Sequence, residues 1–297
     1  MAVEPVLKKT DTVAPAAVLS LAALAIGEAL TKAEVSSRRG RGLADAERST
    51  APVLAYAEFG VQPALAEYVV CTWVDPVREQ RRPVLPDACI DLVWDGATLF
   101  VAGPDTHAVA ITSPASFVGI RFRPGAAPRF LGVGAHELLD QTIPLTELWG
   151  GSAEILAEQL AEDPPAAASV LEQALLKQQA AREPADTLVT RAVREIGRSS
   201  GEPAHIHLLA RRLGVNERTL RRRCTDALGY GPKTLDRILR FRRALRLIRS
   251  NVPLADAARQ VGYADQSYLT NECRRLANAT PGELASGPFT ITGNGCN

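Results

Sequence analysis

The sequence has no apolar run long enough to cross a membrane. Its longest run, at residues 16–26, holds 11 residues, whereas a transmembrane helix needs about 20. Lys8 and Lys9 precede this run, so a signal peptide is the alternative interpretation, although the rest of the chain has the composition of an intracellular protein. We therefore expect no membrane partner.

The cysteines and histidines lack the spacing of a metal site. The five cysteines are scattered without a CxxC pair, and no histidine stands at zinc-ligand spacing. This pattern favours reduced thiols and a cytoplasmic protein. The front half contains a thin set of cupin-type ligands. We interpret its histidines as surface residues, and Asp87 and Asp91, which flank Cys89, as caps of their own loop, so we predict no metal and no cofactor. The set is His107, His136, Glu137, Asp87, Asp91 and Asp105.

Motifs of catalysis are missing as well, since the chain has no GxSxG sequence that would support a Ser-His-Asp site. The net charge is only +1, but it is unevenly distributed. From Ala181 to the C-terminus there are 20 Lys and Arg against 11 Asp and Glu, and the residues before Ala181 have 14 against 22. An acidic body with a basic end indicates an anionic partner. We expect no catalysis.

The sequence pattern of the front half is typical of a β-rich fold. Four short runs of β-forming residues, bounded by Pro, Gly or Asp turn signals, lie at residues 68–74, 89–94, 98–103 and 117–122. Short strands at this spacing predict a sandwich or a small barrel. Helical spacing of apolar residues follows beyond residue 150, interrupted by Pro164 and Pro165.

These patterns predict an α+β protein of several domains. We expect a poorly ordered extension at residues 1–50, because no hydrophobic period is established there. A β-rich domain with trailing helices follows at 51–183, then a basic all-helical domain at 184–286 and a tail at 287–297.

The basic end contains an internal duplication. Segments 209–224 and 257–273 align with a single one-residue slip in the turn of the second copy. The matching pairs are Ala210 with Ala258, Gly214 with Gly262, Leu220 with Leu269, Cys224 with Cys273 and Pro232 with Pro281.

Each copy has the residues that a helix-turn-helix requires. The paired alanines allow close helix contact, and Gly214 and Gly262 can adopt the positive φ of the turn. Asn216 and Asp265 stand where an N-cap would begin the second helix. The paired leucines would point inward and hold that helix against the first.

The outward faces of the two second helices are polar. A helix fits the major groove, where Arg pairs with guanine and Asn or Gln with adenine. The alternative, two solvated faces of structural helices, is disfavoured by the in-register repetition within a basic segment. The predicted base contacts are Arg218, Arg221 and Arg222 in the first copy and Gln266, Ser267, Thr270 and Asn271 in the second.

Residues 232–251 between the copies predict a connecting helix of about 25 Å, which would place the two second helices about one DNA turn apart. Lys233 at its start is an expected phosphate contact, together with Arg223 and Arg274. The other arginines of this helix are expected to touch phosphates or to form a solvated face. They are Arg237, Arg240, Arg242, Arg243 and Arg246.

The C-terminal third resembles the AraC/XylS family of transcription regulators. The most specific part is DAARQVGYADQSYLTNECRRLANATPGEL, which includes the Gly-Tyr turn, the Asp-Gln-Ser-Tyr helix start and the later Thr-Pro. The resemblance implies two helix-turn-helix units joined by a long helix, and it carries the base-contact roles to the residues named above. Cys224 and Cys273 depart from the family, which commonly has a Phe at both positions.

The front half is similar to a cupin-like domain of uncharacterised role, on residues 82–96, 101–109, 118–133 and 138–150. This resemblance implies a domain that senses a small molecule, dimerises, or does both. Arg121 and Arg123 alternate along one strand, so they would either clamp an anionic effector or face solvent.

We therefore predict a cytoplasmic, sequence-specific DNA-binding transcription regulator. The expected partners are double-stranded DNA, a small-molecule effector, a second copy of the chain and, for an activator, RNA polymerase. One alternative is a sequence-independent architectural DNA binder. A DNA-repair fusion with a methyl-accepting cysteine domain is another, but it would need several cysteines on zinc, which Cys71 and Cys89 alone do not supply.

Overall fold

The computed structural model describes residues 56–76, 82–111, 116–179, 186–198, 203–287 and 289. The predicted extension at 1–50, the predicted boundary at 183/184 and most of the predicted tail lie outside these residues. Within them, no helix combines the length and the apolar character needed to cross a bilayer.

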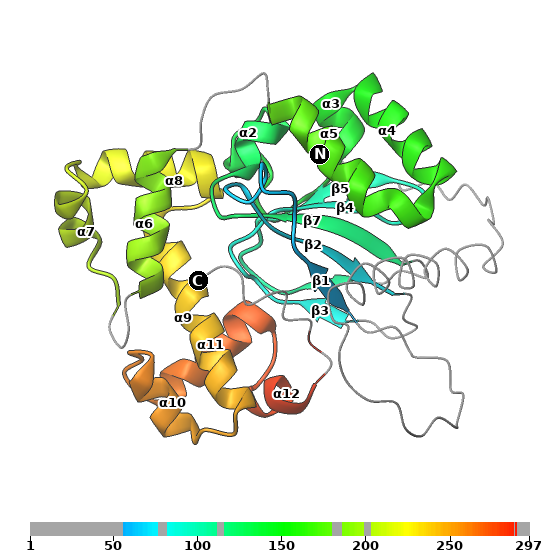
Figure 1. Ribbon diagram of the computed structural model, residues 1–297. Helices are drawn as coiled ribbons and strands as arrows, with labels where there is room; N and C mark the ends of the chain where they lie inside the picture. Colours follow the sequence, from blue (N-terminus) through cyan, green and yellow to red (C-terminus); the bar gives the residue numbers. More distant parts are fainter. Residues whose placement is uncertain are drawn as a thin grey trace, which may run out of the picture.

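The β-rich part, described residues 56–179, is built on a six-stranded antiparallel sheet of order β1-β2-β7-β4-β5-β8 (Figure 1). A separate two-stranded ribbon pairs β3 with β6. The four sequence-predicted runs correspond to β2, β4, β5 and β7. The strands are β1 (Ala57–Phe59), β2 (Val69–Asp75), β3 (Arg82–Val84), β4 (Asp91–Trp94), β5 (Leu99–Ala102), β6 (Val109–Ile111), β7 (Phe117–Phe122) and β8 (Thr142–Pro144).

Helices cover one face of the six-stranded sheet (Figure 1). Ile120 and Phe122 of β7 are fully buried there with Phe130, Leu160 and Leu171 of the helices, and removing these side chains from water stabilises the layer. The helices are α2 (Ala127–Leu131), η1 (Ala135–Glu137), α3 (Leu145–Trp149), α4 (Gly151–Glu162), η2 (Pro164–Ala166) and α5 (Ala167–Gln179).

The C-terminal helical part, described residues 186–287, contains the duplicated segments and is all helical, as the sequence predicts. One core joins α6, α7, α8 and the first half of α9, and a second core joins the rest of α9 to α10, α11 and α12. The helices are α6 (Thr187–Arg198), α7 (Ile206–Arg212), α8 (Glu217–Leu228), α9 (Pro232–Arg249), α10 (Leu254–Gln260), α11 (Gln266–Ala277) and α12 (Pro281–Ser286).

One loop of the β-rich part packs against both of these helical cores. Leu85 is buried in the core formed by α9–α12, and Ala88 is buried in the core formed by α6–α9. Between them, the carbonyl oxygen of Asp87 accepts a hydrogen bond from Arg242 of α9 at 3.2 Å. The segment from Leu85 to Ala88, which we call the bridging loop, therefore lies across the middle of α9.

Candidate nucleic-acid interface

The first helix-turn-helix unit consists of α7, a turn and α8. Gly214 in the turn has φ +74°, a conformation that glycine adopts without strain. The side chain of Asn216 caps α8 by accepting a hydrogen bond from the backbone N–H of Thr219 at 2.8 Å. Leu220 and Cys224 are fully buried on the inner face of α8. All these features confirm the sequence-based interpretation of this copy.

The second unit, α10, its turn and α11, repeats this construction. Gly262 has φ +76°. Asp265 caps α11 by accepting a hydrogen bond from the N–H of Tyr268 at 2.7 Å. Leu269 and Cys273 are fully buried beneath the helix. The two copies therefore share turn, cap and inner face, as expected from the internal duplication.

A cysteine in place of a larger apolar residue is well accommodated at both inner faces. Burial raises the pKa of the Cys224 and Cys273 thiols to about 12, so both remain neutral at physiological pH. A neutral thiol packs as a small apolar group. The departure from the family pattern therefore leaves each helix seated on an apolar core.

The outer faces of α8 and α11 are open to solvent. Arg218, Arg221 and Arg222 are exposed at i, i+3 and i+4 of one helical face, so their guanidinium groups point away from the buried leucine. In α11, Gln266, Ser267 and Asn271 are exposed in the same way. Thr270 is half-buried, and its hydroxyl donates to the carbonyl oxygen of Gln266 at 2.9 Å, which engages that hydroxyl within its own helix.

Tyr268 is a surface feature that the sequence reasoning missed. Its side chain, in the first turn of α11, is 50% exposed, and its ring lies 5.7 Å from the buried Tyr263 ring. The sequence signal was its place beside Gln266 and Ser267, three residues after the N-cap. An exposed ring at this position presents an apolar surface suited to a thymine methyl group.

The predicted phosphate contacts have different environments. Lys233 is exposed in the first turn of α9, and Arg274 is exposed in the last turn of α11. Arg223 instead forms an ion pair with Asp186, with 2.5 Å between Nε and Oδ2. Contact between Arg223 and a phosphate would have to compete with this carboxylate.

Most arginines of α9 bond to other parts of the chain. This corrects the expectation that they contact phosphates or form a solvated face. Arg240 donates to the carbonyl oxygen of Gly262 at 3.3 Å and pairs with Asp236 at 3.2 Å. Arg243 donates to the carbonyl oxygen of Gly197 at 3.1 Å. These bonds join α9 to the end of α6 and to the turn of the second unit.

The predicted pair Arg121 and Arg123 does not form a clamp. Arg121 is 1% exposed and bound by carboxylates of the chain itself, at 3.0 Å from Asp91 and 3.5 Å from Glu58. Arg123 follows the end of β7, is exposed, and donates to the carbonyl oxygen of Ala66 at 2.9 Å. The alternative of two solvent-facing arginines is therefore also wrong for Arg121.

The two candidate histidines lie in separate places. His107 is 3.3 Å from Asp140, and His136 is 3.8 Å from Asp226 of α8. Across the described ranges, no cluster of three or more His, Cys, Asp and Glu side chains has metal-binding geometry. Asp87 caps its own loop, as we expected, by accepting a hydrogen bond from the N–H of Cys89 at 2.9 Å.

The described cysteines are of two kinds. Cys71, like Cys224 and Cys273, is free and buried. Cys89 is disulfide-bonded, which differs from the expectation of reduced thiols at every position.

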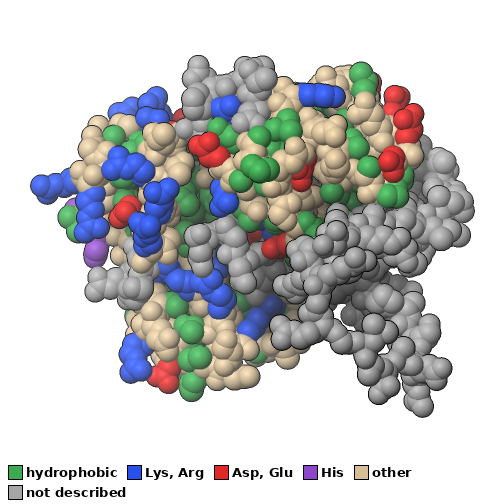
Figure 2. All heavy atoms as spheres, in the orientation of Figure 1, with side chains coloured by type: hydrophobic (Ala, Val, Ile, Leu, Met, Phe, Trp, Pro, Cys, Tyr) green, Lys and Arg blue, Asp and Glu red, His purple; other side chains and the backbone are tan. Residues whose placement is uncertain are grey.

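Basic side chains gather on the side of the molecule that carries the C-terminal helices, whereas acidic and apolar side chains are frequent over α3–α5 (Figure 2). This is the spatial form of the charge asymmetry in the sequence. A basic face with two exposed polar helices has the electrostatics of a DNA-binding surface.

Two family comparisons match the chain. Residues 209–286 match a family described as a helix-turn-helix domain, and residues 58–144 match a domain of unknown function. The first match covers both duplicated segments with α9 between them. No curated protein sequence matches the chain.

Several solved structures are similar to the chain at low sequence identity. The C-terminal domain of AraT, a response regulator from Geobacillus stearothermophilus, is 22% identical, with 36% of this chain and 90% of that chain covered and a TM-score of 0.33. ToxT from Vibrio cholerae is 11% identical, with 81% and 100% covered and a TM-score of 0.42. An unsaturated fatty acid-bound form of ToxT is 12% identical, with 75% and 98% covered and a TM-score of 0.40.

Proposed function

From the premise that the C-terminal part is an AraC-type helix-turn-helix domain in a DNA-binding transcription regulator, we propose that the chain reads two successive major grooves with α8 and α11. The observation that carries the proposal is the repetition itself. Both helices have the same cap, the same buried leucine and cysteine, and an exposed polar outer face. Two unrelated structural helices would each have a polar outer face, but they would not need the same cap and the same buried leucine and cysteine.

The length of α9 supports a fixed spacing between the two reading helices. Its 18 residues span about 27 Å at 1.5 Å per residue, close to the roughly 34 Å between successive major grooves on one side of DNA. Arg240 and Arg243 join this helix to the turn of the second unit and to the end of α6 through backbone carbonyls. We therefore propose a rigid spacer that makes the protein selective for the distance between two short sites.

We assign base contacts to the exposed polar residues of both reading helices. Arginines of the first unit suit guanine, and Gln266 and Asn271 of the second suit adenine. Lys233 and Arg274 are the proposed phosphate contacts, since both are exposed near an end of a helix. The full proposed base-contact set remains Arg218, Arg221, Arg222, Gln266, Ser267, Thr270 and Asn271.

Selection of preferred sites from random duplex DNA tests the proposal directly. The full chain should enrich two short sequence blocks separated by about one helical turn. Inserting five base pairs between the blocks should abolish tight binding, because it rotates the second block to the other side of the duplex. Enrichment of no sequence would instead favour an architectural DNA binder.

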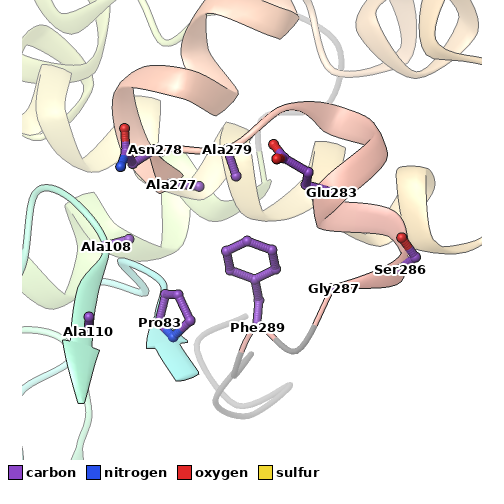
Figure 3. A pocket seen from close by; sticks show the side chains of 10 residues that line it. All are labelled: Pro83, Ala108, Ala110, Ala277, Asn278, Ala279, Glu283, Ser286, Gly287 and Phe289. Atoms are coloured by element: carbon purple, nitrogen blue, oxygen red, sulfur yellow. The ribbon is translucent and has the colours of Figure 1, made fainter. Parts of the chain in front are cut away.

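We propose that the β-rich part modulates this reading through the bridging loop. Leu85 and Ala88 each complete one helical core, so movement of the loop would change the support of both units together. A hollow of about 430 Å³ between the β3–β6 ribbon and the end of α11 with α12 offers a place for a small effector (Figure 3). Its lining is largely apolar, with Pro83, Ala110 and Phe289 among its walls.

A thermal-shift screen of small molecules tests the effector proposal. Ala110→Trp, an exposed position on β6, should fill the hollow and abolish the stabilisation that an active compound gives to the unmodified chain. A compound that stabilises both proteins equally would bind elsewhere. Sedimentation at several protein concentrations tests the proposed dimer. We also propose that the protein acts in the cytoplasm. If it activates transcription, we propose that it contacts RNA polymerase.

A further inference from the structure

A hollow of about 280 Å³ beside the first helix-turn-helix unit is surrounded by arginines. Arg191, Arg194 and Arg198 lie at i, i+3 and i+7 of α6 and so share one helical face. Arg212, at the end of α7, also lines the hollow. The remaining walls are Glu195 and Leu213. Neighbouring basic side chains are visible over α6 and α7 in Figure 2.

The four guanidinium groups form no ion pair within the described part of the chain. All four side chains are exposed, and no ion pair or hydrogen bond joins any of them to another described residue. Glu195 also lines the hollow and takes part in another interaction, and its single negative charge leaves the four arginines in excess. Arg191 and Arg194 are three residues apart, and Arg194 and Arg198 are four apart. Like charges at these spacings repel one another, and an anion between them would offset that repulsion.

We infer that this hollow binds a phosphate group. Arginine presents a planar fork of N–H donors that matches phosphate oxygens, and several forks around one hollow satisfy more than one oxygen. None of the four arginines belongs to the base or phosphate contacts proposed above. The site therefore adds an anion-binding function on a face of the domain that the sequence motifs did not indicate.

Two sources of phosphate share this chemistry. One is the DNA backbone, because Arg212 immediately precedes the turn that leads into α8, and α6 itself packs against α8. The other is a free phosphorylated small molecule, which the size of the hollow admits. The first source rests on the proposed function, whereas the second is independent of it.

The first arm of the test uses inorganic pyrophosphate and the full-length chain in a thermal-shift titration. Pyrophosphate should raise the Tm of the unmodified chain by a few degrees, with chloride at equal ionic strength as the reference. The double variant Arg194→Gln/Arg198→Gln should lose this rise. The matched control, Arg246→Gln/Arg259→Gln, changes two exposed arginines on α9 and α10 and should keep it.

The second arm measures the affinity for DNA over a series of salt concentrations. If the backbone occupies the site, Arg194→Gln/Arg198→Gln should weaken binding to all duplexes alike and lower the slope of log K against log salt by about 1. If a free phosphorylated molecule occupies it, the slope should stay unchanged while the pyrophosphate response is lost. Both results support the site and distinguish its source.

The inference is overturned if the double variant matches the unmodified chain in both arms. Circular dichroism must show that the variant is folded, and since the replaced side chains are exposed, its helical signal should equal that of the control variant. If the unmodified chain binds no DNA at all, the proposed function fails, but the pyrophosphate arm still decides whether the site exists.

Discussion

Asp87 makes contacts with two arginines that belong to different parts of the chain. Its carbonyl oxygen accepts a hydrogen bond from Arg242 of α9 at 3.2 Å, and its carboxylate lies 3.6 Å from the Nε of the buried Arg121 in the sheet. Polar contacts thus run from the centre of the β-sheet to the centre of α9. Burial lowers the pKa of Arg242, which fits an interior position.

Replacing Arg242 by methionine should weaken the contact between the β-rich part and the C-terminal helical part. The variant leaves the carbonyl oxygen of Asp87 without this donor, so the free energy of unfolding should fall by about 1–3 kcal/mol. Urea denaturation measures this, with Arg246→Met on the exposed side of α9 as the control, expected within about 0.5 kcal/mol of the unmodified chain. Equal stability of both variants would contradict the role of this contact.

The two reading helices should lose specificity when their outward polar groups are removed. Arg222→Ala and Asn271→Ala should each weaken binding to a selected DNA site by about 1–3 kcal/mol and relax base preference at one position. Lys233→Ala should weaken all DNA alike and lower the salt slope by about 1. Gel-shift titrations on matched and mismatched duplexes measure both effects. A uniform loss in all three variants would reject the assignment.

The caps of the reading helices should contribute similarly to stability. Asn216→Ala and Asp265→Ala each remove one side-chain acceptor from a helix N-terminus, at an expected cost of about 0.5–2 kcal/mol. Asn216→Asp and Asp265→Asn keep an acceptor, so they should retain most of the free energy of unfolding that the alanine variants lose. Chemical denaturation followed by circular dichroism provides the comparison, and failure of both conservative replacements would mean that the caps are not the cause.

Stability should decline with rising pH because of Asp105. Burial, followed by the neighbouring Asp87, Asp140 and Asp91, raises the pKa of Asp105 to about 7. A raised acid pKa means that the folded chain holds a proton that the unfolded chain has released, so this contribution is complete below about pH 4 and is lost as pH rises through 7. Each pKa unit corresponds to about 1.4 kcal/mol.

Asp105→Asn should remove the fall in the free energy of unfolding between about pH 4 and 7. At pH 8 the variant should therefore be more stable relative to the unmodified chain than it is at pH 5. Urea midpoints at pH 5 and pH 8 give the measurement. Asp163→Asn, an exposed carboxylate after α4, is the matched control and should leave the pH dependence unchanged. An unaltered slope in Asp105→Asn would place its origin in another group.

The helix-turn-helix units were predictable because their determinants are local. Gly214, Asn216 and Leu220 act within one turn and one helix, and the second copy repeats them at a nearly constant offset. The longer strands were predictable for the same reason, since β2 and β7 are runs of alternating or continuous apolar residues. In contrast, β1, β3, β6 and β8 have three residues each, which is too short for a period to show.

The interactions between the two parts were not predictable from the chain alone. Leu85 and Ala88 are ordinary apolar residues in sequence, and only the fold shows that each enters a different helical core. Arg121 was misread because a strand pattern does not reveal that Asp91 on the neighbouring strand lies directly opposite in the register. Arg240, Arg242 and Arg243 of α9 bind backbone carbonyls, which carry no sequence signal.

The bridging loop has a practical consequence for anyone who would express the C-terminal helices by themselves. Truncation before α6 would uncover the two apolar sites that Leu85 and Ala88 now fill, one in each half of the fragment. Such a fragment would be prone to self-association through these newly exposed apolar surfaces. Polar replacements on the α9 side chains that border the two sites would be the rational route to a well-behaved minimal fragment.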